Sequence, residues 1–250
     1  MKIKKILVSQ PKPTSEKSPY FDLAAKHNLK IDFRPFIQVE GISSKEFRIQ
    51  KIDILDYTAV LFTSKHAVNN YFRIAEELRI EIPDSMKYFC QSESIALYLQ
   101  KYIVYRKRKI FFGEKRFAEL VDVVKKHTNE KYLVPVSDQH KAEISKLLDA
   151  AKIEYTKAIY YRTVSSDLSD LSKLNYDVLV FFSPSGVKSL LQNFPQFEQN
   201  NTRIASFGAN TTNAVKEAGL RVDIEVPKPE TPSMSMALEC YIQQENKKKK

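Results

Sequence analysis

The sequence predicts an α/β protein with parallel sheets in two similar domains, and one duplicated strand–turn–helix stretch is the main reason. Residues 176–187 (YDVLVFFSPSGV) open with β-branched and aromatic residues and carry no charge after Asp177, as a central strand buried on both faces does. The polar turn 183–186 ends that run, and a helical apolar repeat follows. Residues 57–68 (YTAVLFTSKHAV) match this stretch position for position. The fold class therefore depends on two copies of one β–turn–α unit.

The match between the two copies extends beyond the turn. Downstream, residues 89–95 resemble residues 206–212, and upstream, residues 31–37 resemble residues 153–159. A repeat period near half the chain length is too long for a solenoid and fits two similar α/β domains. Ligands of open α/β sheets bind outside the carboxyl ends of the strands, so duplicated turns predict a cleft lined from both domains.

Apolar runs bounded by polar turns predict the strands, and apolar residues at helical spacing predict the helices. The predicted strands are 4–9, 31–34, 57–62, 86–90, 103–105, 131–136, 153–164, 176–182, 203–207 and 221–226. The predicted helices are 19–27, 47–55, a helix after Val68 that ends before Pro83, 94–101, 117–124, 142–151, 187–194, 212–218 and 236–243. Residues 35–42 and 158–163 are extended, and we expect them to pair as connectors between the domains.

Composition excludes several classes of protein. A hydrophobic content of 43% with 28% charged residues is ordinary for a globular chain of 250 residues. With five glycines, the sequence has neither a G-x-G-x-x-G fingerprint nor a phosphate loop. Cys90 and Cys240 are predicted to be reduced thiols of a cytoplasmic protein. The absence of a long apolar run predicts no membrane segment and no signal peptide.

The net charge of +10 indicates a polyanionic partner. Without the lysine run 247–250, which we expect to be disordered, an excess of about six positive charges is left. Nucleic acid and a polyanionic small molecule both fit this charge. The densest basic patch is 106–109, but the sequence has no helix-turn-helix signature and no basic residues interleaved with aromatics along a sheet face.

The serine turns have two interpretations. Ser183, Ser185 and the free amides that follow suit an anionic group at a helix N-terminus. Alternatively, the serine is an N-cap without a ligand. The histidines are expected to be structural, with His27 near the C-terminal end of a helix dipole and His127 and His140 exposed to solvent.

Five segments in sequence order together resemble the uroporphyrinogen-III synthase family. They are Phe62-Thr63-Ser64, Tyr161-Arg162-Thr163-Val164, Phe181-Phe182-Ser183-Pro184-Ser185-Gly186, the Gly208 turn with Thr211 before Ala218-Gly219-Leu220, and Thr231-Pro232-Ser233. The resemblance extends from Ile3 to about Tyr241. Each segment alone is common in α/β proteins, whereas the ordered set is fairly specific.

The resemblance implies a bilobed enzyme with a central cleft. Its two flavodoxin-like, parallel-sheet domains would be joined by a two-stranded β-ladder linker. Domain 1 would be discontinuous, from residues 1–34 and 164–250, and domain 2 would comprise residues 43–157. Residues 35–42 and 158–163 would form the ladder.

The family reaction implies a lyase of porphyrin and haem biosynthesis. Such enzymes close the linear tetrapyrrole hydroxymethylbilane into uroporphyrinogen III, inverting the terminal pyrrole ring with loss of water. The substrate is an octacarboxylate, which accounts for the basic chain without nucleic acid. The resemblance implies no metal and no cofactor, and we expect a cytoplasmic monomer that binds neither nucleic acid nor membrane.

The resemblance also implies the site residues. Tyr161 matches a tyrosine proposed to assist the departing hydroxyl, and a phenol could donate that proton. His66 stands where relatives often carry arginine, and Gln91 replaces a glycine usual in the family. The expected substrate-binding residues are Ser64, Lys65, His66, Gln91, Ser92, Ser183, Ser185, Gly186, Asn210 and Thr211. The alternatives are a non-catalytic bilobed anion-binding or regulatory module, and a basic RNA-associated α/β protein.

Overall fold

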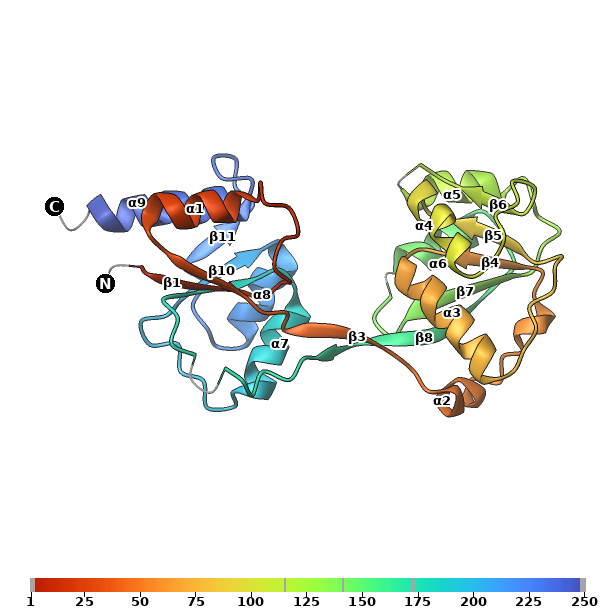
Figure 1. Cartoon of the computed structure of the whole chain (residues 1–250), viewed down its shortest axis with the longest axis horizontal. Helices are drawn as coiled ribbons and strands as arrows, with labels where there is room; N and C mark the ends of the chain where they lie inside the picture. Colours follow the sequence, from red (N-terminus) through yellow and green to blue (C-terminus); the bar gives the residue numbers. More distant parts are fainter. Residues whose placement is uncertain (1–2, 115, 141, 172–173, 248–250) are drawn as a thin grey trace. The chain divides into compact units, whose positions relative to one another are not determined.

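The computed structural model describes residues 3–114, 116–140, 142–171 and 174–247. The chain divides into two units, unit 1 from Met1–Gln38 and Val164–Lys250 and unit 2 from Val39–Thr163. Each unit contains a sheet with helices on both of its faces (Figure 1). The predicted mixed α/β fold with parallel sheets is confirmed.

Unit 1 contains a five-stranded sheet in the order β11-β10-β9-β1-β2. Its strands are β1 (Lys5–Val8), β2 (Lys30–Phe33), β9 (Val178–Phe181), β10 (Arg203–Phe207) and β11 (Ile224–Val226), all parallel. The helices α1 (Pro19–His27) and α9 (Met234–Lys247) pack on one face, and α7 (Pro184–Asn193) and α8 (Ala209–Glu217) pack on the other (Figure 1). Burial of both faces explains why β9 has an uninterrupted apolar sequence.

The six-stranded sheet of unit 2 has the order β3-β8-β7-β4-β5-β6, and the first residues of β3 and the last residues of β8 belong to unit 1. The strands of this sheet are β3 (Ile37–Gly41), β4 (Ala59–Phe62), β5 (Lys87–Cys90), β6 (Ile110–Phe112), β7 (Tyr132–Ser137) and β8 (Tyr155–Ser165). The helical segments are α2 (Ser44–Ile49), η1 (Ile54–Asp56), α3 (Lys65–Glu77), α4 (Glu93–Tyr98), η2 (Leu99–Lys101), α5 (Phe117–Val124) and α6 (Ala142–Ala150). The strand pairs from β8 across to β6 are parallel, so their carboxyl ends meet at one edge.

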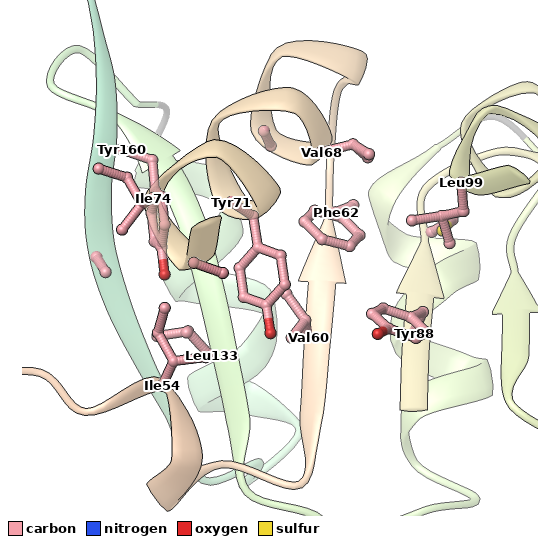
Figure 2. Close-up of a cluster of buried hydrophobic side chains, with 14 of the residues drawn as sticks. Ile54, Val60, Phe62, Val68, Tyr71, Ile74, Tyr88, Leu99, Leu133 and Tyr160 are labelled. Atoms are coloured by element: carbon pink, nitrogen blue, oxygen red, sulfur yellow. The ribbon is translucent and has the colours of Figure 1, made fainter. Parts of the chain in front are cut away.

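Aromatic side chains fill much of the core between α3 and the sheet of unit 2 (Figure 2). The Phe62 ring of β4 contacts the ring of Tyr71, with 5.5 Å between the centroids, and Tyr71 lies 5.9 Å from Tyr160 of β8. The hydroxyls of Tyr71 and Tyr160 are buried without a hydrogen-bond partner among the described residues. The position of β8 relative to α3 is therefore fixed by apolar ring contacts.

Most predicted strands and helices are confirmed, but the predicted strand 103–105 is wrong. Residues 103–105 are irregular, and Val104 is 77% exposed. The strand at this edge is β6, where Ile110 pairs with Tyr88 and is buried. A short apolar triplet beside the basic run 106–109 did not indicate which side of the run enters the sheet.

Two helix boundaries also differ from the prediction. The predicted helix 47–55 is instead α2 followed by η1, because Lys51 between them has a φ of 53°, which no helix accommodates. The last helix starts at Met234 and extends to Lys247. The rest of the lysine run expected to be disordered, 248–250, lies outside the described residues.

The cysteines are free thiols, with Cys90 buried and Cys240 exposed. Among the described residues, no helix combines the length and the apolarity that crossing a membrane requires.

Candidate functional site

The carboxyl edge of each sheet places polar turns at the point where the chain direction reverses. In unit 2, the chain leaves β4 toward β5 on one side and leaves β7 toward β8 on the other, and β4 and β7 are neighbours. In unit 1, the corresponding neighbours are β1 and β9. Open α/β sheets bind ligands at such points.

In unit 2, Ser64 joins the turn after β4 to a tyrosine of β8. Ser64 is the N-cap of α3, and its Oγ accepts a hydrogen bond from the Ala67 amide at 3.1 Å. The same Oγ lies 3.1 Å from the Tyr161 hydroxyl, within hydrogen-bonding distance. Two residues predicted to belong to the site, one a cap and the other a candidate acid, are thus in direct contact.

A β-bulge turns Tyr161 toward Ser64. Along β7 and β8, Val136 pairs with Ile159, and the next residue, Ser137, pairs with Tyr161, so Tyr160 is the extra residue. Successive strand residues normally point to opposite faces, but here Tyr160 is 0% and Tyr161 8% exposed. Simple alternation along the strand would have pointed only one tyrosine inward.

The Tyr161 phenol keeps its proton at neutral pH. Burial raises the pKa of Tyr161, and the hydrogen bond with Ser64 offsets part of that rise. A protonated phenol in a half-shielded site can donate a proton to a leaving group.

A pocket of about 680 Å³ opens beside the Tyr161 side chain. It is lined by Thr63 and Gln91 after β4 and β5, by the turn after β7, and by the start of α5 with Arg116. Sequence reasoning anticipated Gln91 and Tyr161 but missed Arg116, Ser137 and His140. Ser137 is the first polar residue after the predicted strand 131–136, and that signal could have identified it.

His140 and His127 are both half-buried, so the prediction that they are exposed to solvent is wrong. The Nδ1 of His140 lies 2.9 Å from the Ser137 carbonyl oxygen, so it carries the proton and donates it. Its Nε2 accepts from the Lys157 ammonium at 3.0 Å. His127 packs its ring 4.4 Å from Phe111. Both residues gained partners from strands that are distant in sequence.

The other predicted residues of unit 2 lie at the same edge. The Lys65 ammonium sits 5.2 Å above the ring of Tyr98, a cation–π distance. The His66 ring lies 6.2 Å from the Tyr161 ring. Ser92 precedes α4 as its N-cap, and its Oγ is 3.2 Å from the Ser94 Oγ.

In unit 1, the predicted residues gather at the starts of α7 and α8. Ser183 caps α7, and its Oγ accepts from the Gly186 amide at 3.2 Å, while Ser185 lies in the same first turn. Gly208 caps α8 with a φ of 85°, a conformation that favours glycine. Asn210 is exposed, but Thr211 is only 2% exposed. The two turns thus offer amides and an exposed amide side chain.

No three His, Cys, Asp or Glu side chains come together as a metal site within the part of the chain that the structure describes.

Comparison with known proteins identifies the family. The sequence profile described as "Uroporphyrinogen-III synthase HemD" matches residues 19–235. The chain belongs to the uroporphyrinogen-III synthase family. A uroporphyrinogen-III synthase is a cyclising lyase of porphyrin and haem biosynthesis, so this chain is an enzyme of that class, as the motifs predicted.

Solved structures show the same fold. The uroporphyrinogen-III synthetase of Helicobacter pylori is similar with a TM-score of 0.58 at 18% identity, over 97% of this chain and 100% of that one. A mutant uroporphyrinogen-III synthase of Thermus thermophilus is similar with a TM-score of 0.51 at 14% identity, over 98% of this chain and 99% of that one. No curated protein sequence matches this chain.

Proposed function

We propose that this chain closes hydroxymethylbilane with Tyr161 as the proton donor to the departing hydroxyl. The observation that carries the proposal is the buried phenol, held at 3.1 Å from Ser64 beside a pocket of about 680 Å³. Because burial raises the pKa of Tyr161, the proton is available at neutral pH.

In the proposed reaction, the phenol proton passes to the hydroxyl oxygen as the C–O bond breaks, and water leaves. The resulting methylene carbon bonds to the α carbon of the terminal pyrrole that already carries the neighbouring bridge. The bond between that α carbon and the bridge then breaks, and the bridge carbon bonds to the free α carbon of the same ring, which inverts the ring. The proton released from this second α carbon returns to the phenolate. The Ser64 hydroxyl stabilises the phenolate by donating to it. The balance is one substrate converted to one macrocycle and one water, and Tyr161 regains its proton.

The serine turns are proposed to hold substrate carboxylates. Helix N-termini favour anions, and α3, α4, α7 and α8 begin at the carboxyl edges. We assign Ser64, Lys65, His66, Gln91 and Ser92 to this role in unit 2, and Ser183, Ser185, Gly186 and Asn210 in unit 1. Burial of Thr211 favours support of its turn over direct contact. A net charge of +10 suits an octacarboxylate.

We also propose the finer architecture that the resemblance implied. In chain order, the strands of unit 1 lie in the order 2-1-3-4-5, which is typical of flavodoxin-like sheets. The neighbouring positions of β3 and β8 support the proposal that residues 35–42 and 158–163 form a two-stranded ladder. Free thiols at Cys90 and Cys240 favour a reducing, cytoplasmic compartment. We expect a monomer.

The test is to incubate the protein with enzymatically generated hydroxymethylbilane and to separate the type I and type III isomers. Type III product above the protein-free control is expected, because type I arises without ring inversion. A non-catalytic anion-binding module would bind the tetrapyrrole but leave the isomer ratio unchanged. Tight, salt-sensitive retention of duplex DNA or RNA without type III synthesis would favour the nucleic-acid interpretation.

A further inference from the structure

Beyond the bulge that directs Tyr161, β8 has no partner strand on its β7 side. β7 ends at Ser137, whereas β8 continues to Ser165. Because β7 ends at this point, the Tyr161 carbonyl and the Thr163 amide need other partners on the β7 side. Asp138, the first residue after β7, supplies them.

The Asp138 carboxylate joins the turn after β7 to β8 through one oxygen. Its Oδ1 accepts hydrogen bonds from the Ser137 hydroxyl at 2.8 Å and the Gln139 amide at 2.9 Å, both within its own turn. The same Oδ1 accepts from the Thr163 amide of β8 at 3.2 Å. The backbone amide of Asp138 donates to the Tyr161 carbonyl oxygen at 3.1 Å. One residue thus holds β8 at Tyr161 and again two residues later.

A second set of hydrogen bonds holds the same turn at its C-terminal end, through His140. His140 donates through Nδ1 to the Ser137 carbonyl, and Lys157 of β8 donates to His140 Nε2. Lys157 also donates to the Ser145 hydroxyl at 2.9 Å. The turn 137–140 is therefore attached to β8 before and after the bulge, and it cannot shift without moving the strand that carries Tyr161.

We propose that Asp138 is a positioning residue for Tyr161, and this inference depends on the proposed function of Tyr161 as the acid. Asp138 is exposed on the turn and holds the bulged backbone with its carboxylate oxygen. The bulge, in turn, sets the 3.1 Å approach of the phenol to Ser64. Misplacing a catalytic group by about 1 Å lowers the rate by roughly a hundredfold.

Two substitutions separate the acceptor geometry from the charge. Asp138→Ala removes the acceptor and is expected to lower kcat by about 10- to 100-fold with KM little changed. Asp138→Asn keeps an oxygen that can accept the same bonds, and it should retain most of kcat. Asp149→Ala is the matched control, because Asp149 also binds β8, but through the Tyr155 hydroxyl at the start of the strand. It should behave as wild type.

Wild-type kcat in Asp138→Ala, or an equal loss in Asp138→Asn, would overturn the inference. In the latter case, the negative charge would matter rather than the position. Adding Asp138→Ala to Tyr161→Phe should cause no further loss of kcat, because the residue acts through the phenol. An additive loss would contradict that route.

A readout without turnover separates this inference from the proposed acid role. In protein labelled with ¹³Cζ-tyrosine, the Tyr161 resonance is assigned by its absence in Tyr161→Phe. Its chemical shift or titration should change in Asp138→Ala and not in Asp149→Ala. An unchanged resonance overturns the positioning role even if Tyr161 is catalytic. A changed resonance, with Tyr161→Phe fully active, supports the positioning role while refuting the acid.

Discussion

The turn after β4 and the turn after β9 have the same backbone conformation but different chemistry. Ser64 has φ and ψ of −156° and 160°, and Ser183 has −153° and 152°. Each serine Oγ accepts from the amide three residues later, Ala67 or Gly186, at 3.1 and 3.2 Å. The sequence repeat therefore reproduces the cap in both units.

The neighbouring strands make the difference. In unit 2, β8 lies two strands from β4, extends over 11 residues and carries Tyr161 to Ser64. In unit 1, the strand at the equivalent position, two strands from β9, is β2, which has only 4 residues. Near Gly186, the polar neighbours are the hydroxyls of Ser9 and Ser183. A duplicated cap thus supplies the framework proposed to bind anions in both units, and a phenol added by one extended strand makes one copy a candidate acid as well.

Removing the phenol should have the largest effect. Tyr161→Phe keeps the ring and its packing but removes the proton, so kcat for type III synthesis should fall by about 10²–10⁴-fold. The measurement is the rate of type III isomer formation from hydroxymethylbilane.

Tyr160→Phe is the internal control for this substitution. The Tyr160 hydroxyl is buried without a partner among the described residues (Figure 2), so its loss should leave activity near wild type and cost no stability. Full type III synthesis by Tyr161→Phe would reduce Tyr161 to a packing role. Unit 2 would then retain only the anion-binding role that is proposed for the turns of both units.

Alkaline pH should destabilise unit 2 more than unit 1. Burial raises the pKa of six phenols in unit 2, namely Tyr71, Tyr88, Tyr132, Tyr155, Tyr160 and Tyr161. In unit 1, burial raises the pKa of Tyr20 and Tyr176 to about 12 each. Above about pH 10, the unfolded chain releases these protons first, so the free energy of unfolding falls as pH rises.

Each fully buried phenol, such as Tyr71 or Tyr160, contributes a loss of about 1.4 kcal/mol per pH unit between its unfolded and folded pKa values, and the partly exposed phenols contribute less. Buried Cys90, with its pKa raised to about 12, adds to unit 2 in the same direction. Limited proteolysis between pH 9 and 11.5, with fragments identified by mass spectrometry, reports the two units separately. Earlier cleavage in unit 1 would contradict the expected order.

The sequence predicted the caps and most strands, because these depend on local patterns. Ser64 and Ser183 follow apolar runs and precede helical repeats, so their roles could be read directly. The bulge could not be predicted from the sequence, because it depends on the register between β7 and β8. The inward orientation of both Tyr160 and Tyr161 follows only from that register. The edge position of β6 was missed for the same reason.

The partners at the site were also beyond sequence reasoning. The contact between Ser64 and Tyr161 spans 97 residues and was not predicted, since the family resemblance implied only that both residues belong to the site. Asp138 and His140 follow a predicted strand as ordinary polar residues, and their bonds to Thr163 and Lys157 exist only once β8 lies beside β7. Long-range pairing gives these residues their roles.

Removing each capping hydroxyl should separate helix capping, which both serines share, from the contact with Tyr161, which only Ser64 makes. Ser64→Ala and Ser183→Ala should each lower the free energy of unfolding by about 1 kcal/mol, because each removes one N-cap bond. Ser64→Ala should also lower kcat by about five- to tenfold, as loss of one hydrogen bond to the phenol would. Ser183→Ala should leave kcat unchanged and raise KM.

Denaturant unfolding and steady-state kinetics on the same preparations provide both readouts. The threonine variants of both serines keep the hydroxyl and should recover most of the stability. Equal kcat in the two alanine variants would show that the Ser64 contact with Tyr161 has no part in the reaction.

The smallest expected effect tests the position three residues after each capping serine. Ala67 occupies it in unit 2 and Gly186 in unit 1. A Cβ on Gly186 would lie 3.5 Å from the Phe181 ring, 3.5 Å from the Ser183 Oγ and 3.8 Å from the Ser9 Oγ, all ordinary contacts. Gly186→Ala should therefore fold and gain up to about 0.5–1 kcal/mol from the lower backbone entropy of alanine. Because the new methyl faces the Ser183 hydroxyl, which is proposed to bind a carboxylate, KM should rise about fivefold, as roughly 1 kcal/mol of crowding would cause. Unfolding and KM are measured against wild type, and an unchanged KM would remove Gly186 from the binding site while leaving the assignment of Ser64 and Tyr161 intact.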